Sequence, residues 1–177
     1  MSDTNKDRNP GADVSVPTTA AVCGLFCNAC SIYIGSHEDP RRLAAFASRM
    51  GWSIEEAHCD GCRAEQRTPY CHACTFRTCA AERGLDFCGE CSDFPCAELD
   101  EFQRERPHRA ELYGDLDQIA EVGVETWMTQ VSQRYTCPKC GTLNSAYDLK
   151  CRECGHEPAS AYVATHRDAI VEALSRL

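Results

Sequence analysis

The sequence is poor in positive charge and, apart from cysteine, in apolar residues. Its 18 Lys and Arg residues are outnumbered by 27 Asp and Glu residues, which gives a formal net charge of −9 at pH 7. General nucleic-acid binders and proteins held on anionic membranes need a surplus of Lys and Arg, so this balance argues against both classes. Without cysteine, roughly a third of the residues are apolar, and many of these are alanine. We therefore expect a thin apolar core that needs additional support.

Several sequence signals are also missing. Residues 1–19 contain no basic region followed by an apolar stretch, so no secretory signal peptide is evident. The uncharged segment 14–36 contains Pro17, Gly24 and three cysteines, and it is therefore not an apolar membrane span. No serine-hydrolase triad order, phosphate-binding loop or dinucleotide-binding fingerprint is present. These absences predict a cytoplasmic protein that does not enter a membrane.

Cysteine, in contrast, is abundant. The chain has 15 cysteines, which is far above average usage. In the reducing cytoplasm cysteines stay as thiols, and their spacing there indicates metal or redox sites before disulfides. The odd number also prevents complete internal pairing. The cysteines fall into two blocks, Cys23–Cys96 and Cys137–Cys154, which are separated by a long stretch without cysteine.

These blocks suggest a small, irregular, metal-stabilised α+β fold made of five segments. The first segment is polar and lacks any hydrophobic periodicity, which is typical of a disordered leader. The predicted segments are a disordered leader at 1–20, a cysteine-rich metal-binding domain with zinc knuckles at 21–100, a helical connector at 101–135, a zinc ribbon at 136–157 and an amphipathic terminal helix at 158–177.

One helix is well marked inside the first block. Asp39 can cap it, Pro40 suits its first turn and Gly51 is suited to end it. Ser53 and Glu56 then form the pattern of a capping box, which predicts a short helical turn. The buried stripe expected for the longer helix consists of Leu43, Phe46, Ala47 and Met50.

The connector and the end of the chain also show helical periodicity. In the connector Gly123 is a weak point, because glycine costs about 1 kcal/mol relative to alanine inside a helix. The apolar side of the connector consists of Leu116, Ile119, Ala120, Gly123, Trp127 and Val131. The apolar face of the terminal helix consists of Val163, Ile170, Val171, Leu174 and Leu177.

The first block contains a repeat with the spacing C-x2-C-x4-C. The repeat recurs with an offset of 17 residues, and one more C-x2-C pair precedes it. Eight thiols are enough for two closed tetrahedral four-cysteine sites, although the spacing does not assign cysteines to particular ions. Such knuckles need small residues, and Gly61 and Gly89 meet this need. The cysteines concerned are Cys59 and Cys62, then Cys71, Cys74 and Cys79, then Cys88, Cys91 and Cys96.

Cys23, Cys27 and Cys30 have the spacing C-x3-C-x2-C and no fourth cysteine of their own. Radical enzymes that use S-adenosylmethionine hold a four-iron cluster with this spacing, but on a larger barrel, and an aromatic residue precedes the third cysteine where Ala29 stands here. Two interpretations remain. In the favoured one a further ligand closes a structural zinc site; in the other the fourth position is open and the centre is reactive. The candidate fourth ligands are His58, His72, His37 and a carboxylate.

The second block has two knuckles, CPKCG and CRECG, each of which ends in the glycine that its turn requires. This pattern predicts a zinc ribbon, with iron as the minor alternative. Lys139, Lys150 and Arg152 are too few beside Glu153 and Glu157 to favour nucleic acid. The expected ligands are Cys137, Cys140, Cys151 and Cys154.

Three runs of sequence carry a resemblance to a known family. CGLFCNAC at 23–30, CDGC at 59–62 and CHACTFRTCAAERGLDFCGECSDFPC at 71–96 resemble an uncharacterised, cysteine-rich bacterial and archaeal family, a domain of unknown function. Its members often continue into a helix with a Gly-x-Glu-x-Trp pattern, matched here at 123–127, and then into a ribbon. The resemblance covers about residues 21–157. It implies a metal-binding protein, with zinc as the metal, and supplies no substrate.

The leading hypothesis is a multi-site zinc protein with about two to four ions, acting as an adaptor or assembly module that contacts another protein. The alternative is a metal–thiolate enzyme or an iron–sulfur redox protein centred on Cys23, Cys27 and Cys30. Nucleic-acid binding is the least supported role, and the residues do not decide whether the protein is an enzyme. All 15 cysteines are predicted metal ligands.

Overall fold

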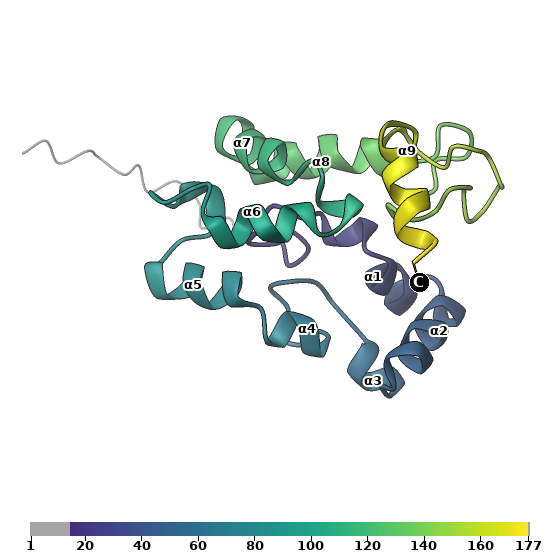
Figure 1. Ribbon diagram of the computed structural model, residues 1–177, viewed down its shortest axis with the longest axis horizontal. Coiled ribbons are helices and arrows are strands. Elements are labelled where there is room, and N and C mark those ends of the chain that lie inside the picture. Colours follow the sequence, from purple (N-terminus) through teal and green to yellow (C-terminus); the bar gives the residue numbers. More distant parts are fainter. Residues whose placement is uncertain (1–14, 177) are drawn as a thin grey trace, which may run out of the picture.

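The computed structural model describes residues 15–176, and more than half of these residues are helical (Figure 1). The α-helices are α1 (Ser31–His37), α2 (Pro40–Met50), α3 (Ile54–Ala57), α4 (Pro69–His72), α5 (Thr75–Arg83), α6 (Ala97–Arg104), α7 (Leu112–Val122), α8 (Val124–Tyr135) and α9 (Ala161–Leu174). The short 3-10 helices are η1 (Cys27–Ala29), η2 (Cys88–Glu90) and η3 (Pro107–Arg109).

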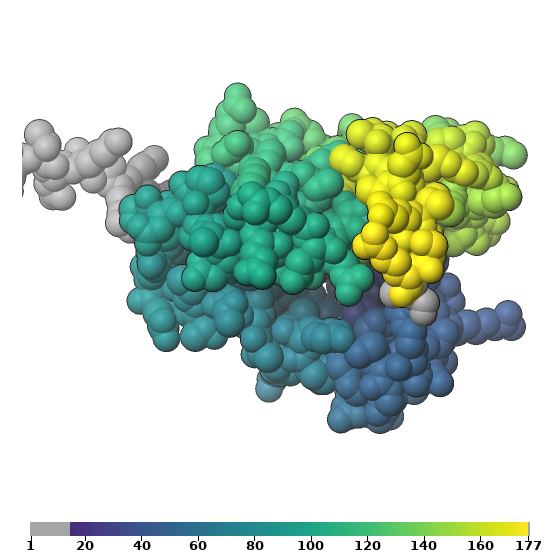
Figure 2. Space-filling model, in the orientation of Figure 1, coloured from purple at the N-terminus to yellow at the C-terminus, as the bar shows by residue number. Residues whose placement is uncertain are grey.

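The helices are arranged in rows. Figure 1 shows α7 and α8 along one side of the molecule, α2 to α5 along the opposite side and α6 between them. Helix α9 lies at one end, where it contacts α8 and η3, and Figure 2 shows it (yellow) on the surface above the blue helices. Within residues 15–176 each helix is too short or too polar to span a lipid bilayer.

The predicted α+β fold is wrong, because residues 15–176 contain no sheet. Their extended pairings are two isolated bridges, Ala20 with Phe26 and Thr136 with Leu143. Several knuckles close on themselves: in the second block the N–H of Gly141 donates to the carbonyl of Cys137 at 3.0 Å. Backbone groups that are used within such turns are not available for a ladder between strands. The cysteine-rich loops therefore connect helices instead of forming a sheet.

The helix predicted inside the first block is confirmed as α2. The side chain of Asp39 accepts a hydrogen bond from the N–H of Arg42 at 3.1 Å, and Pro40 is the first helical residue. Gly51 ends the helix with φ of 68°, a left-handed conformation that favours glycine. The capping box of Ser53 and Glu56 is also present and starts α3.

The connector is helical as predicted, but it is broken at Gly123. This residue has φ of 81° and ψ of 157°, so it ends α7 and precedes the first residue of α8. An interruption of this kind suits glycine because side chains with a Cβ atom disfavour positive φ. Leu116, Trp127 and Val131 of the predicted apolar side are buried, so the periodicity correctly predicted these core residues. It did not predict that the helix is interrupted at Gly123.

The main core joins the connector to the first block. Trp127 is fully buried, its indole N–H donates to Asp115 Oδ1 at 2.9 Å and its ring meets that of Phe26 edge-on at 6.1 Å between centroids. Tyr135 stacks on Tyr162 of α9 with centroids 4.6 Å apart. One continuous buried cluster therefore extends from the first knuckle to the terminal helix.

The terminal helix α9 begins at its cap, Ser160, whose side chain accepts a hydrogen bond from the N–H of Val163. Val163 and Ile170 are buried as predicted, which places this helix against its own chain, whereas Val171 is exposed. Leu177 and residues 1–14 of the predicted leader lie outside the described residues.

The segment 66–96 contrasts with this core. Its buried residues are Thr68, Ala80 and Phe87, although it carries the six cysteines of the repeat. So little buried apolar surface cannot offset the entropy of ordering about thirty residues, at roughly 1–2 kcal/mol each. The folded form of this segment therefore needs another source of free energy, and a metal held by its six thiols can supply it.

Gly61 in the CDGC knuckle has φ of 112°, and a Cβ atom there would lie 2.5 Å from the carbonyl oxygen of Thr18. That oxygen accepts the N–H of Arg63, so it cannot move away freely. We expect Gly61→Ala to lower the free energy of unfolding by about 2–3 kcal/mol. Gly84→Ala, at φ of 67° with no atom within 4 Å, is the control and should cost about 1 kcal/mol. Equal losses in urea unfolding would contradict the steric argument.

The imidazole of His108 is half-buried, with Nδ1 2.7 Å from the hydroxyl of Tyr147. Burial, helped by Arg109 and Arg106, lowers the pKa of His108 to about 3. Because the unfolded state, with a pKa of about 6.5, then binds more protons, stability falls as pH drops below that value. At pH 5.5 the loss relative to pH 7 should be about 1.2 kcal/mol. Urea unfolding of His108→Gln should lack this part of the pH dependence.

Candidate metal centre

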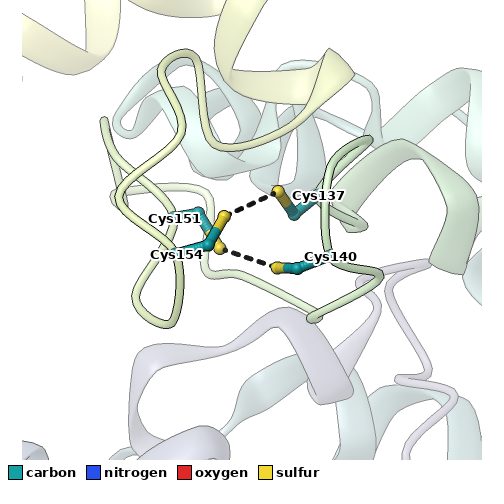
Figure 3. A group of neighbouring side chains, drawn as sticks. All are labelled: Cys137, Cys140, Cys151 and Cys154. Atoms are coloured by element: carbon teal, nitrogen blue, oxygen red, sulfur yellow. Dashed lines mark hydrogen bonds between the residues drawn. The ribbon is translucent and has the colours of Figure 1, made fainter.

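The four cysteines of the second block are gathered into one cluster (Figure 3). Their sulfur atoms all lie within 4.8 Å of one another, with Cys137 and Cys154 3.7 Å apart and Cys140 and Cys151 3.5 Å apart. A tetrahedral ion with metal–sulfur bonds of about 2.3 Å separates its sulfurs by about 3.8 Å. The cluster can therefore hold one tetrahedral ion, but residues 136–157 lack the strands of the predicted ribbon.

Hydrogen bonds prepare this cluster for a cation. The hydroxyl of Thr142 lies 3.3 Å from Cys140 Sγ, and hydrogen bonds from this residue lower the pKa of the Cys140 thiol to about 6. The backbone N–H groups of Glu153 and Cys154 point at Cys151 Sγ. Thiolates are the form that binds metal, so these donors favour the ligand state near neutral pH.

A second group of four thiols surrounds a small cavity. Cys79 comes from α5, Cys88 from η2, Cys91 follows η2 and Cys96 precedes α6. Together with apolar side chains they line a cavity of about 40 Å³. Burial, together with the charges of Cys96 and Cys79, raises the pKa of the Cys88 thiol to about 12. Across residues 15–176 the sulfurs of Cys137–Cys154 are the one four-thiol set within 4.8 Å, so those around the cavity are further apart.

The structure divides the repeat differently from its sequence. Cys79 belongs to the first copy, yet it shares the cavity with all three cysteines of the second copy. Cys71 of the first copy instead meets Cys59, and a hydrogen bond from the Cys71 thiol lowers the pKa of Cys59. The spacing predicted the number of thiols, whereas their grouping follows from how α5 folds back toward η2.

Cys23, Cys27 and Cys30 lie among the thiols of the other knuckles. Burial is the main cause that raises the pKa of each of the three, and neighbouring thiolates add to the effect. Those neighbours include Cys62 for both Cys23 and Cys27, and Cys71 for Cys30. The first three cysteines therefore lie near thiols of the later knuckles, which include Cys62, Cys71, Cys74 and Cys88.

Residues 18–22 hold these loops together. The N–H of Val22 points at Cys62 Sγ, and the carbonyl of Val22 accepts the N–H of Cys88 at 2.8 Å. The carbonyl of Thr19 accepts the N–H of Cys27 at 2.9 Å. Backbone donors of this kind orient thiolate ligands around a metal. The cysteine-rich loops can therefore hold metal ions on a scaffold of backbone hydrogen bonds.

This arrangement of knuckles is the part of the chain that a known family shares. Residues 19–101 match the family model of a protein of unknown function, DUF3795. The match contains every cysteine from Cys23 to Cys96. The comparisons with curated proteins and with solved structures found no match.

The extent of this match refines the resemblance drawn from the sequence. A domain of unknown function is confirmed for the cysteine-rich part, but the DUF3795 match ends at residue 101, whereas the resemblance was expected to reach about residue 157. The helices α7 to α9 and the Cys137–Cys154 cluster lie beyond it.

An arginine stands beside the cavity thiols of the DUF3795 segment. Nη1 of Arg83 lies 3.0 Å from Cys91 Sγ and 2.7 Å from Asp93 Oδ2, and its side chain is about half exposed. Arg83 is not among the site residues predicted from the sequence. Its position four residues after Cys79 on a helix was the available signal, since residues at this spacing share a face.

Two of the histidines considered as a fourth ligand form a group of their own within the DUF3795 segment. Nε2 of His58 lies 2.8 Å from Asp60 Oδ1, and Nε2 of His37 lies 3.3 Å from the same oxygen. The three ligand atoms are within 4.8 Å of one another, and no thiol belongs to the group. His72, the third candidate, is exposed at the end of α4.

Proposed function

We propose that residues 19–101 hold iron–sulfur clusters, that the protein is an electron carrier, and that the Cys137–Cys154 cluster binds a structural zinc ion. The observation that carries this proposal is the contrast between the two four-thiol groups. The sulfurs of one are 3.5 and 3.7 Å apart in its two closest pairs, whereas those of the other surround a cavity of about 40 Å³. A single ion fits the first group, and a larger inorganic group fits the second.

The volume of the cavity supports the proposal of an iron–sulfur cluster at this site. A site for one water-sized sphere needs about 10–15 Å³, so about 40 Å³ accommodates several atoms. A lone tetrahedral zinc ion draws its four thiolates into mutual contact and leaves no such space. Iron–sulfur clusters are held by four cysteine thiolates, which is the donor set present here.

The surroundings of the cavity suit a redox centre. Four thiolates carry considerable negative charge, and Arg83 at Cys91 offsets part of it. When bound, an iron–sulfur cluster supplies one-electron transfer. The chain's own residues fix the positions of the thiols and line the cavity with apolar side chains, while the thiol of Cys79 is exposed at its edge. The apolar residues that line the cavity are Phe76, Leu85, Phe94 and Leu99.

The remaining seven thiols of the matched segment suffice for one further four-cysteine site. Three cysteines then remain, which keeps open the hypothesis of a three-cysteine centre at Cys23, Cys27 and Cys30. An electron carrier needs a protein donor or acceptor, and we place that partner at the exposed edge of the cavity beside Arg83. A reducing compartment such as the cytoplasm keeps these thiols free for metal.

Metal and sulfide analysis of protein purified without oxygen tests the proposal. We expect a brown protein with iron, acid-labile sulfide and about one zinc ion per chain. Cys88→Ser should lose about four iron atoms and keep the zinc. Cys140→Ser is the matched control, because it should lose the zinc and keep the iron.

A colourless protein that contains only zinc would overturn the proposal. It would favour the rival hypothesis, in which every site holds zinc and the protein is an adaptor for another protein. In that case Cys88→Ser should lose one zinc ion and no iron. The iron, sulfide and zinc contents of Cys88→Ser and Cys140→Ser therefore distinguish the two hypotheses.

A further inference from the structure

We propose a separate site for a divalent transition metal, formed by His37, His58 and Asp60 on the surface of the cysteine-rich segment. Its donors are two imidazoles and one carboxylate, and it contains no thiol. The inference does not rest on iron–sulfur clusters being present, because none of its ligands is a cysteine. It assigns a second kind of metal chemistry to this chain.

The spacing of the three ligand atoms fits a shared ion. Nε2 of His58 and Nε2 of His37 lie 2.8 and 3.3 Å from Asp60 Oδ1. Neighbouring ligands of an ion with bonds of about 2.0–2.2 Å are separated by roughly 2.9–3.4 Å. The carbonyl oxygen of Cys59 is 3.2 Å from His37 Nε2 and adds a further oxygen at the same place. The group therefore has the dimensions of one side of a coordination shell.

The three residues come from separate elements that are fixed to one another. His37 ends α1, His58 caps α3 and Asp60 lies in the CDGC knuckle. The N–H of Cys59 donates to the side-chain oxygen of Ser36 at 3.0 Å, which ties the end of α1 to the knuckle. A chelating site needs ligands held in place before the ion arrives, and this contact provides that.

Aromatic packing orients the histidine rings. The ring of Tyr33, one turn earlier in α1, lies 4.3 Å from that of His37 between centroids. The rings of His37 and His58 are 5.6 Å apart. Both imidazoles thus present Nε2 toward Asp60 while one face of His37 is covered.

Charge and exposure also favour a cation. Among residues 15–176, no Lys or Arg lies within 4.0 Å of the Asp60 carboxylate, whose ion-pair partners are the two histidines. The side chains of His37, His58 and Asp60 are 36%, 34% and 41% exposed. An ion held here keeps coordination positions open to solvent, which is the pattern of a reactive site and not of a structural one.

The donor set selects the class of metal. Imidazole suits iron, nickel, copper and zinc, and carboxylate with water suits manganese. Two histidines and one carboxylate with open positions form the donor set of non-haem iron(II) sites. We therefore assign the site to iron(II) or manganese(II), with exchangeable ligands on its open side.

Manganese(II) chloride is the probe for the test, added to the purified protein with its thiol-bound metals in place. Manganese has the lowest affinity in the Irving–Williams order, so it does not displace those metals. Electron paramagnetic resonance of free manganese(II) measures binding. We expect one bound ion per chain, and at least a tenfold loss of affinity in His58→Gln and Asp60→Asn.

His72→Gln is the matched control, because this histidine belongs to the same segment but not to the group, and its manganese binding should equal that of the wild type. Circular dichroism and the iron, sulfide and zinc contents of each variant show whether the fold and the thiol sites are intact. If folded wild-type protein binds no manganese, or if His58→Gln binds it unchanged, the contacts of Asp60 are hydrogen bonds only and the site does not exist. A failure of the electron-carrier proposal appears separately, as missing iron and sulfide.

Discussion

Removal of the thiol-bound metals should unfold residues 66–96 while α7, α8 and α9 stay folded. The first region has few buried residues and six cysteines, whereas the helices share a core around Trp127. Metal held by thiolates stabilises a small site strongly, by on the order of 10–16 kcal/mol for structural zinc, so its loss should leave this region without adequate stabilisation. The expected result is a partly folded protein.

Amide hydrogen exchange after treatment with a chelator and a reductant measures this. Amides of α5 should exchange as in an unfolded chain, and those of α8 should stay protected. The metal-loaded protein is the control, in which both helices are protected. If α5 keeps its protection without metal, the assignment of its stability to the cysteines is wrong.

Replacement of Trp127 by alanine should be the most destabilising single substitution in the helical part. It removes a fully buried indole, which costs about 3–5 kcal/mol. It also removes one of the two donors to Asp115 Oδ1, the other being Arg134, and a hydrogen bond to a charged group contributes about 1.5–3 kcal/mol. The sum approaches the entire stability of an ordinary domain, about 5–15 kcal/mol. Trp127→Ala should therefore be largely unfolded at 37 °C.

Trp127→Phe separates the two contributions. It keeps a ring against Phe26 but removes the hydrogen bond to Asp115, whose pKa is already raised by burial. We expect a loss of about 1–3 kcal/mol in urea unfolding. A loss as large as that of the alanine variant would show that the hydrogen bond, and not the packing of the ring, dominates at this position.

The sequence correctly predicted those features that depend on contacts between residues close together in the chain. The helix from Pro40 to Met50 depends on its own cap, its proline and its terminal glycine, all of which can be identified without knowledge of the fold. The Cys137–Cys154 cluster is likewise built from two self-contained knuckles. In both cases the interacting residues are close in the sequence.

The remaining features depend on contacts between distant residues. The spacing of the repeat gives no reason for Cys79 to join the second copy, since that grouping depends on the path of the chain between α5 and η2. The meeting of His37 with His58 depends on the hydrogen bond between Ser36 and Cys59. Periodicity also could not show that the chain turns at Gly123, or that the knuckles lie between helices without a sheet.

The stretch at 18–22 has a consequence for how the protein takes up its metals. Thr19 and Val22 bond to the first cysteine loop and to the loops that carry Cys62 and Cys88. When one group of thiols binds metal, residues 18–22 become immobilised. The next group then binds metal at a smaller cost in conformational entropy. We therefore expect the thiol groups of residues 19–101 to take up metal with positive cooperativity.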